Sequence, residues 1–151
     1  MVALAVAFIA IVVAIGSWFR QPDDNNQPSI DPVSKYSEQE SAQAKKTMCE
    51  AYTKTTDALE EASGTTSEDP NVKYMIAVNI RLAIHANASY LREALLANPA
   101  TPPELAQIFH NIASSYDEIL MAQLAGTPAE SFDRMNADLD KADADATEAC
   151  K

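Results

Sequence analysis

The sequence predicts an all-α protein: an N-terminal transmembrane helix, a flexible tether, and an antiparallel four-helix bundle closed by one disulfide. Three observations predict this class. Residues 2–19 form an uncharged apolar run, and the chain has only two cysteines. Between the two cysteines, apolar residues recur at alternating steps of three and four, which is the period of packed helices. No strand pattern competes with this period. The length of 151 residues allows one domain and an appendage.

The apolar run VALAVAFIAIVVAIGSWF predicts a membrane anchor over residues 1–20. About 20 residues cross the hydrocarbon core as a helix, and the aromatic pair Trp18 and Phe19 suits a membrane–water interface. The alternative is a cleaved signal peptide, because Ala14 and Gly16 form a small-x-small site. Residues 21–36 contain three prolines and no apolar periodicity, so we expect a flexible polar linker there.

Residues 37–151 contain four helix starts and are expected to form the folded domain. Ser37 to Glu40, Thr101 to Glu104 and Thr127 to Glu130 match capping boxes, and Asp69-Pro70 is a start of the same kind. Gly64 and Gly126 stand where helix ends favour a left-handed residue. With short connections, the four helices should alternate in direction.

Each predicted helix carries an apolar seam, and the second helix is apolar over most of its circumference from Val72 to Leu96, so we expect it to be the most buried. The first seam comprises Met48, Tyr52, Thr55, Leu59 and Ala62. The third comprises Leu105, Phe109, Ile112, Tyr116 and Ile119, and the fourth comprises Phe132, Met135, Leu139, Ala142, Ala146 and Ala149.

Cys49 and Cys150 are predicted to form a disulfide. An up-down-up-down bundle places the end of the fourth helix at the same pole as the start of the first, where these two cysteines fall. A structural disulfide implies an oxidising compartment outside the membrane. Arg20 argues the opposite, because the positive-inside rule would keep the residues after it in the cytoplasm. We give the cysteines more weight and expect a single-pass plasma-membrane protein with its domain outside the cytoplasm.

The segments MCEAYTKTTDALEEA, NIRLAIHANASYLREALLANPATPPELA and TEACK follow the apolar anchor and the polar tether in this order. With that order, the chain resembles a group of mycobacterial exported or membrane-anchored, alanine-rich helical proteins of unknown function. The resemblance implies a location outside the plasma membrane and implies no activity.

The search for chemical sites yields no catalytic residue, no metal site and no cofactor. The formal net charge of −11 excludes a protein that binds nucleic acid by neutralising phosphates. Asn79 and Asn87 lie in the most apolar helix and need hydrogen-bond partners if they are enclosed. The tyrosines that could supply these partners are Tyr74, Tyr90 and Tyr116. Such a cluster would either fix the register of the helices or line a cavity for an amphiphile.

These features predict a non-enzymatic, membrane-anchored cell-envelope protein. It would act as an interaction module or as an accessory subunit of a membrane complex, for example a respiratory or transport complex, and its partners would be the membrane and a protein in the same envelope. The alternative is an extracytoplasmic carrier or sensor that binds a lipid or hydrophobic small molecule between its helices.

Overall fold

The computed structural model describes residues 35–151, which form four α-helices and one short 3₁₀ turn. The helices are α2 (Glu38–Ser63), α3 (Pro70–Ala97), α4 (Pro103–Leu124) and α5 (Phe132–Ala149), and the turn is η1 (Ala129–Ser131). The all-α fold is therefore confirmed for this part of the chain. The expected anchor over residues 1–20 and nearly all of the linker lie outside the described residues. Within 35–151, no helix has the length and apolarity needed to cross a membrane.

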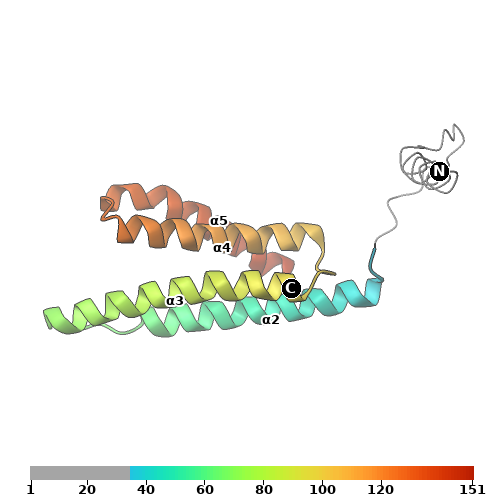
Figure 1. Ribbon diagram of the computed structural model, residues 1–151, viewed down its shortest axis with the longest axis horizontal. Helices are drawn as coiled ribbons and strands as arrows, with labels where there is room; N and C mark the ends of the chain where they lie inside the picture. Colours follow the sequence, from blue (N-terminus) through green and yellow to red (C-terminus); the bar gives the residue numbers. More distant parts are fainter. Residues whose placement is uncertain (1–34) are drawn as a thin grey trace, which may run out of the picture. The chain divides into compact units, whose positions relative to one another are not determined.

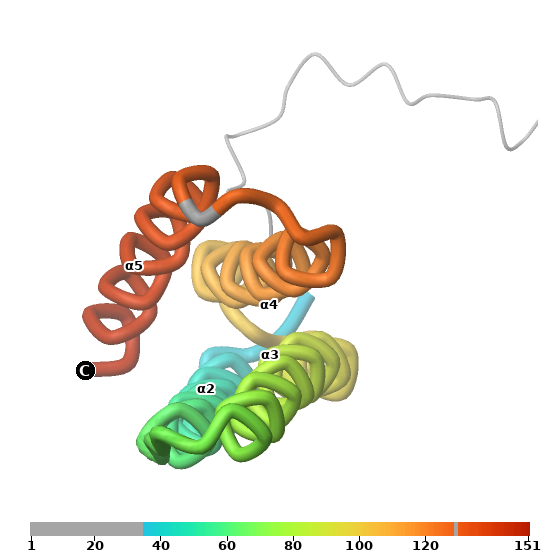
Figure 2. The backbone as a smooth tube through the Cα atoms, turned by 90° about the vertical axis from the view of Figure 1, so that its left-hand side faces the viewer, coloured from blue at the N-terminus to red at the C-terminus, as the bar shows by residue number. Residues whose placement is uncertain are grey.

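The four helices alternate in direction along the chain. Figure 1 shows α2 and α4 running one way and α3 and α5 running the other. Each helix packs against the next one in sequence, as short connections require. Figure 2 shows that α5 is steeply inclined to the other three helices and descends toward α2 at its C-terminal end. The bundle is therefore regular over α2, α3 and α4 and splayed at α5.

The core is built from the predicted seams. Phe109, Ile112 and Tyr116 of α4 are almost fully buried, and so are Met48 of α2 and Leu91 of α3. The rings of Tyr52 and Phe109 pack at 5.7 Å between centroids, within the range in which aromatic pairs stabilise a core. The fourth seam is buried only at Ala142 and Ala146, and its remaining members pack against the edge of the core: Phe132, Met135, Leu139 and Ala149.

Two of the predicted helix starts are confirmed. At Ser37, the side-chain hydroxyl accepts from the Glu40 amide at 3.3 Å, and the Glu40 carboxylate accepts from the Ser37 amide at 2.8 Å. This hydrogen bonding lowers the pKa of Glu40. At Asp69, the carboxylate accepts from the Asn71 amide at 2.8 Å, and Pro70 occupies the first turn, where no amide hydrogen is needed.

The other two predicted capping boxes are wrong. The Thr101 hydroxyl donates to the Asn98 carbonyl at 2.7 Å, so it closes the preceding turn, and α4 begins at Pro103 without a side-chain cap. After Thr127 the chain forms η1 first, and α5 begins only at Phe132. Gly126 is left-handed as predicted, with φ of 66°, whereas Gly64 is right-handed with φ of −69°. The Gly64 amide donates to the Glu60 carbonyl and so continues the helical hydrogen bonding.

The prediction that the second helix is the most buried is also wrong. The buried residues of α3 begin only at Ile84 and are Ile84, Asn87, Ala88, Leu91 and Leu95. The reason is the unequal length of the helices: α3 has 28 residues and α4 has 22. The Arg81 guanidinium donates to the side-chain oxygen of Gln123, which is the penultimate residue of α4. The first turns of α3 therefore project past the end of α4, as Figure 1 shows.

Candidate functional site

The disulfide joins Cys49 to Cys150, with Cα atoms 5.7 Å apart, across 101 residues of sequence. The pairing was predicted, but its place in the fold differs from the expected pole. Cys49 lies inside α2, well after the helix start at Glu38. The inclination of α5 brings its C-terminal end against this middle part of α2 (Figure 2). The bond therefore ties the splayed helix back to the bundle.

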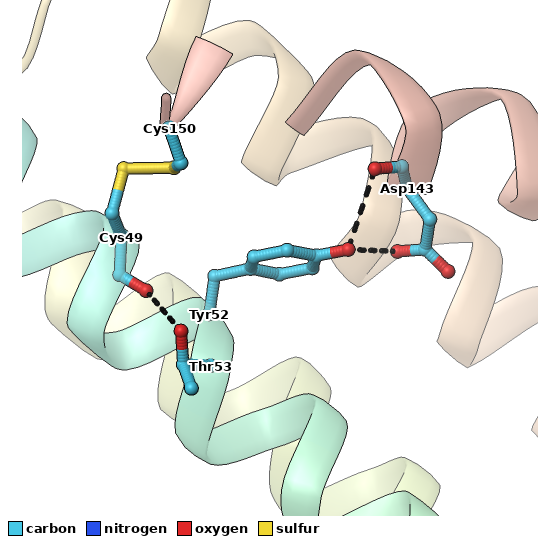
Figure 3. Close-up of a disulfide and its surroundings, with 5 residues drawn as sticks. All are labelled: Cys49, Tyr52, Thr53, Asp143 and Cys150. Atoms are coloured by element: carbon cyan, nitrogen blue, oxygen red, sulfur yellow. Dashed lines mark hydrogen bonds between the residues drawn. A yellow bond between two sulfur atoms is a disulfide. The ribbon is translucent and has the colours of Figure 1, made fainter. Parts of the chain in front are cut away.

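Near the disulfide, Tyr52 of α2, one turn after Cys49, and Asp143 of α5 extend the contact between these two helices. The Tyr52 hydroxyl lies 3.2 Å from the Asp143 carboxylate and 3.4 Å from the Asp143 carbonyl (Figure 3). Burial raises the pKa of Asp143 and outweighs the opposite effect of the hydrogen bond from Tyr52. Burial also raises the pKa of Tyr52. A partly desolvated carboxylate is thus held by a neutral phenol.

Asn87 and Tyr116 lie in the interior beside this contact. The Asn87 amide donates to the Thr55 carbonyl at 2.7 Å, and Asn87 also hydrogen-bonds Tyr116, whose pKa is raised by burial. Among the described residues, every buried side-chain polar atom has a hydrogen-bond partner. We call this group the core polar cluster, and it comprises Tyr52, Thr55, Asn87, Tyr116 and Asp143. Because its members satisfy one another, the cluster fits a role in fixing helix register.

The structure does not bring the remaining predicted residues into that cluster. Asn79, Tyr74 and Tyr90 are exposed on α3. Asp143 also belongs to the cluster, although its place in the run Asp138, Asp140, Asp143 and Asp145 had suggested a solvated face. The available signal was its position beside Ala142 on a helix whose small residues face the core, since an aspartate there needs a partner.

Tyr74 instead belongs to an exposed apolar surface along the first half of α3. We call this surface the α3 stripe and define it as Val72, Tyr74, Met75, Val78 and Leu82. The side chains of Tyr74, Met75 and Leu82 are 69%, 68% and 63% exposed. The other exposed large hydrophobic side chains of residues 35–151 lie on α3 or at the end of α4: Tyr90, Leu96, Met121 and Leu124.

The α3 stripe borders an open, mostly apolar groove. The groove is also lined by Ala62 at the end of α2, by Thr65 in the loop that follows, and by Ile76 and Asn79 of α3. Figure 2 shows α2 on one side of α3 and α4 above it, so the outer side of α3 faces away from both neighbours. A single exposed leucine is ordinary, whereas a continuous apolar patch marks an interaction surface.

The charges around the stripe differ from those of the chain as a whole. From Pro70 to Arg92 there is no acidic residue, although the chain has a formal net charge of −11. Lys73 and Arg81 are the charged side chains within the length of the stripe. Acidic residues lie instead on the last turns of α2 and in the loop before α3: Asp57, Glu60, Glu61, Glu68 and Asp69. The stripe is therefore an apolar, weakly basic face on an acidic domain.

The described part of the chain offers no comparable candidate for metal or acid–base chemistry. In residues 35–151, no three His, Cys, Asp or Glu side chains lie close enough to hold a metal ion. His85 and His110 are both exposed. A polar groove between α4 and α5 includes Glu118, Lys141 and Asp145, but Lys141 already pairs with Asp145 at 2.8 Å. The α3 stripe is thus the best candidate for function.

Comparisons with protein-family models, with curated proteins and with solved structures give no match to this chain. The function of the chain is therefore inferred from the geometry of the domain.

Proposed function

We propose that the protein is a non-enzymatic, membrane-tethered interaction module of the cell envelope and that the α3 stripe is its binding surface for a protein partner. The observation that carries this proposal is the exposure of five large apolar side chains in succession on one projecting helix. Leaving such a surface in water is unfavourable by about 25 cal/mol per Å² of apolar area, and covering it provides the driving force for association.

The disulfide supports a location outside the cytoplasm, because structural disulfides persist in oxidising compartments. The tether joins the domain at Ser37, at the start of α2, and the stripe lies at the opposite end of α2 and α3. At about 1.5 Å per residue, the 26 residues of α2 separate these two ends by about 39 Å. The stripe therefore lies at the end of the domain that is remote from Ser37. This arrangement suits an accessory subunit that reaches a partner in the same envelope.

A second candidate function is favoured by the groove beside the stripe. Its apolar lining would accept the chain of a lipid or another hydrophobic small molecule, as in a carrier or sensor. The groove is open along its length and lies outside the helical core, so such a ligand would lie on the surface of the domain and not at its centre.

The test is purification of the full-length protein in mild detergent from its own membranes, with co-purifying proteins and extracted lipids identified by mass spectrometry. Three forms are compared: the wild type, Leu82→Glu and Leu96→Glu. Leu96 is the matched control, because it is an equally apolar, 82% exposed residue of the same helix outside the groove. We expect a stoichiometric protein partner that Leu82→Glu loses and Leu96→Glu keeps.

Two results would contradict the proposal. Retention of the same proteins by the Leu82→Glu variant would show that the stripe does not bind them. A defined lipid that is lost with Leu82→Glu, in the absence of any protein partner, would establish the carrier function instead.

A further inference from the structure

The exposed face of α3 has the pattern of a helix–helix interface. Outward-facing residues follow one another at alternating steps of four and three, and they are Asn71, Met75, Val78, Leu82 and His85. This is the spacing by which one helix packs along another. The apolar residues Met75, Val78 and Leu82 occupy the centre of this row. The polar residues Asn71 and His85 lie one heptad before and one heptad after Val78. Read in both directions from Val78, the exposed apolar residues Tyr74 and Leu82 match at four residues, whereas Met75 is matched by Arg81 at three residues.

A surface with this partial symmetry fits a second copy of itself. In an antiparallel pair of α3 helices centred on Val78, Tyr74 of one copy lies opposite Leu82 of the other, and Asn71 lies opposite His85. The contact is the same patch on both copies, which is the form of a two-fold dimer interface. We propose that two copies of this chain associate through the α3 stripe in this antiparallel arrangement.

The charge distribution favours self-association on this face over any other. Two domains with a formal net charge of −11 each repel one another, but the stretch from Pro70 to Arg92 contains no acidic residue. A contact confined to this stretch brings no two carboxylates together. The antiparallel orientation also keeps apart the acidic groups near the start of α3, among them Glu61 and Glu68, which a parallel pair would place side by side.

The area of the surface is sufficient for a specific but modest interface. The five side chains of the stripe are 38–69% exposed, so covering them would give a small interface, near the lower limit of about 1,000 Å² in total for recognised biological interfaces. The outer side of α3 faces away from α2 and α4, so a second helix can approach it (Figure 2). Two copies held on one membrane would meet at high local concentration, and this favours a dimer of modest affinity.

This inference rests on the proposed function, because it names the partner of the same surface. It is tested on the full-length protein in density-matched detergent by sedimentation velocity, with the Cys49–Cys150 disulfide intact. We expect a dimer for the wild type and for Leu96→Glu, and a monomer for Leu82→Glu and Met75→Glu at the same concentration. A monomeric wild type, or a dimer that survives Leu82→Glu, would overturn the inference.

The orientation is tested with single cysteines. Val78→Cys places two thiols across the two-fold axis and should give a disulfide-linked dimer on mild oxidation. His85→Cys should not, because fourteen helical residues separate the two positions 85 by about 21 Å along the axis. Efficient cross-linking of His85→Cys would establish a parallel pair and contradict the arrangement.

The two proposals fail in distinguishable ways. If the purified wild type is monomeric but Leu82→Glu still abolishes capture of another protein from native membranes, self-association is rejected. The proposal that the stripe binds a protein partner is then retained. If the protein dimerises through the stripe and captures nothing else, the second copy is its partner.

Discussion

The Arg81 guanidinium donates to the side-chain oxygen of Gln123 over 3.3 Å, and this contact marks the place where α4 ends while α3 continues without it. Before Arg81, α3 contributes no buried residue, and Tyr74, Met75 and Val78 are exposed. After Arg81, the same helix enters the core, beginning with Ile84. This hydrogen bond therefore lies close to the boundary between the part of α3 that is buried in the core and the part that carries the stripe, which ends one residue later at Leu82.

This boundary predicts uneven protection of α3 from hydrogen exchange. The amides of residues 73–80 should exchange faster than those of residues 84–95, because the second group packs on both α2 and α4 and opens only with the core. Exchange measured by mass spectrometry on the full-length protein in detergent tests this. Uniform protection along α3 in the Leu82→Glu variant, which removes self-association, would contradict the boundary.

The disulfide should contribute strongly to stability because it closes a long loop. Replacing both Cys49 and Cys150 by serine is expected to lower the free energy of unfolding by up to about 4.7 kcal/mol, the chain-entropy value for a loop of about 100 residues. Urea unfolding with and without reductant measures the effect. Reductant should destabilise the wild type and leave the double variant unchanged, and α5 should lose its protection from exchange before α2. Equal sensitivity of the two proteins to reductant would argue against the bond.

Asn87 and Asn79 form a matched pair on one helix. Asn87→Ala removes the donor to the Thr55 carbonyl and the partner of Tyr116, and is expected to cost about 1–3 kcal/mol of stability. Asn79→Ala removes only an exposed side chain and should be neutral or slightly stabilising, since alanine is the better helix former. Thermal and urea unfolding compare the two. Equal effects would show that the core polar cluster does not contribute as described.

Asp143 should make stability depend on pH in the acidic range. Burial raises its pKa, so the folded domain binds a proton at this carboxyl more tightly than the unfolded chain does. The resulting stabilisation is fully present below the ordinary pKa of an aspartate and is lost as the pH rises through the raised pKa. At pH 7, Asp143→Asn should therefore be slightly more stable than the wild type, by less than about 1 kcal/mol because the carboxyl is partly solvated.

That advantage should shrink as the pH is lowered from 7 toward 4, because the wild-type carboxyl becomes neutral as well. Melting temperatures of both proteins across this range provide the measurement, and Asp138→Asn, at an exposed position of the same helix, is the control. If the stability advantage of Asp143→Asn stays constant or grows on acidification, the pKa of Asp143 is not raised in the folded domain.

The periodicity of the sequence was sufficient to predict the helices, their alternation and the cysteine pair. Those features depend on local patterns: the Ser37 capping box, the seam from Leu105 to Ile119, and short connections. The periodicity was not sufficient to predict the splay of α5, which is a matter of the angle at which helices cross, or the projection of α3, which depends on relative helix lengths. An apolar helix reads as buried whether or not a neighbour covers each of its faces, and Met75, like Leu82 and Leu96, lies on a face of α3 that stays exposed along the helix.

The candidate site was predictable only in part for the same reason. Asn87 was singled out as a polar residue that needs a partner and Tyr116 as a residue that could supply one, and the two interact in the core. Tyr74 was grouped with them because helical periodicity alone does not show where along a helix the packing stops. The Arg81–Gln123 contact is what places Tyr74 on the exposed side of that boundary.

The most direct test of the binding surface is site-specific photo-cross-linking in native membranes. A photoreactive amino acid at position 82 of the full-length protein should give a discrete cross-linked product, and the same group at position 96 should give none or much less. A product of the same size from both positions, or from neither, would contradict the assignment of the α3 stripe as the binding surface.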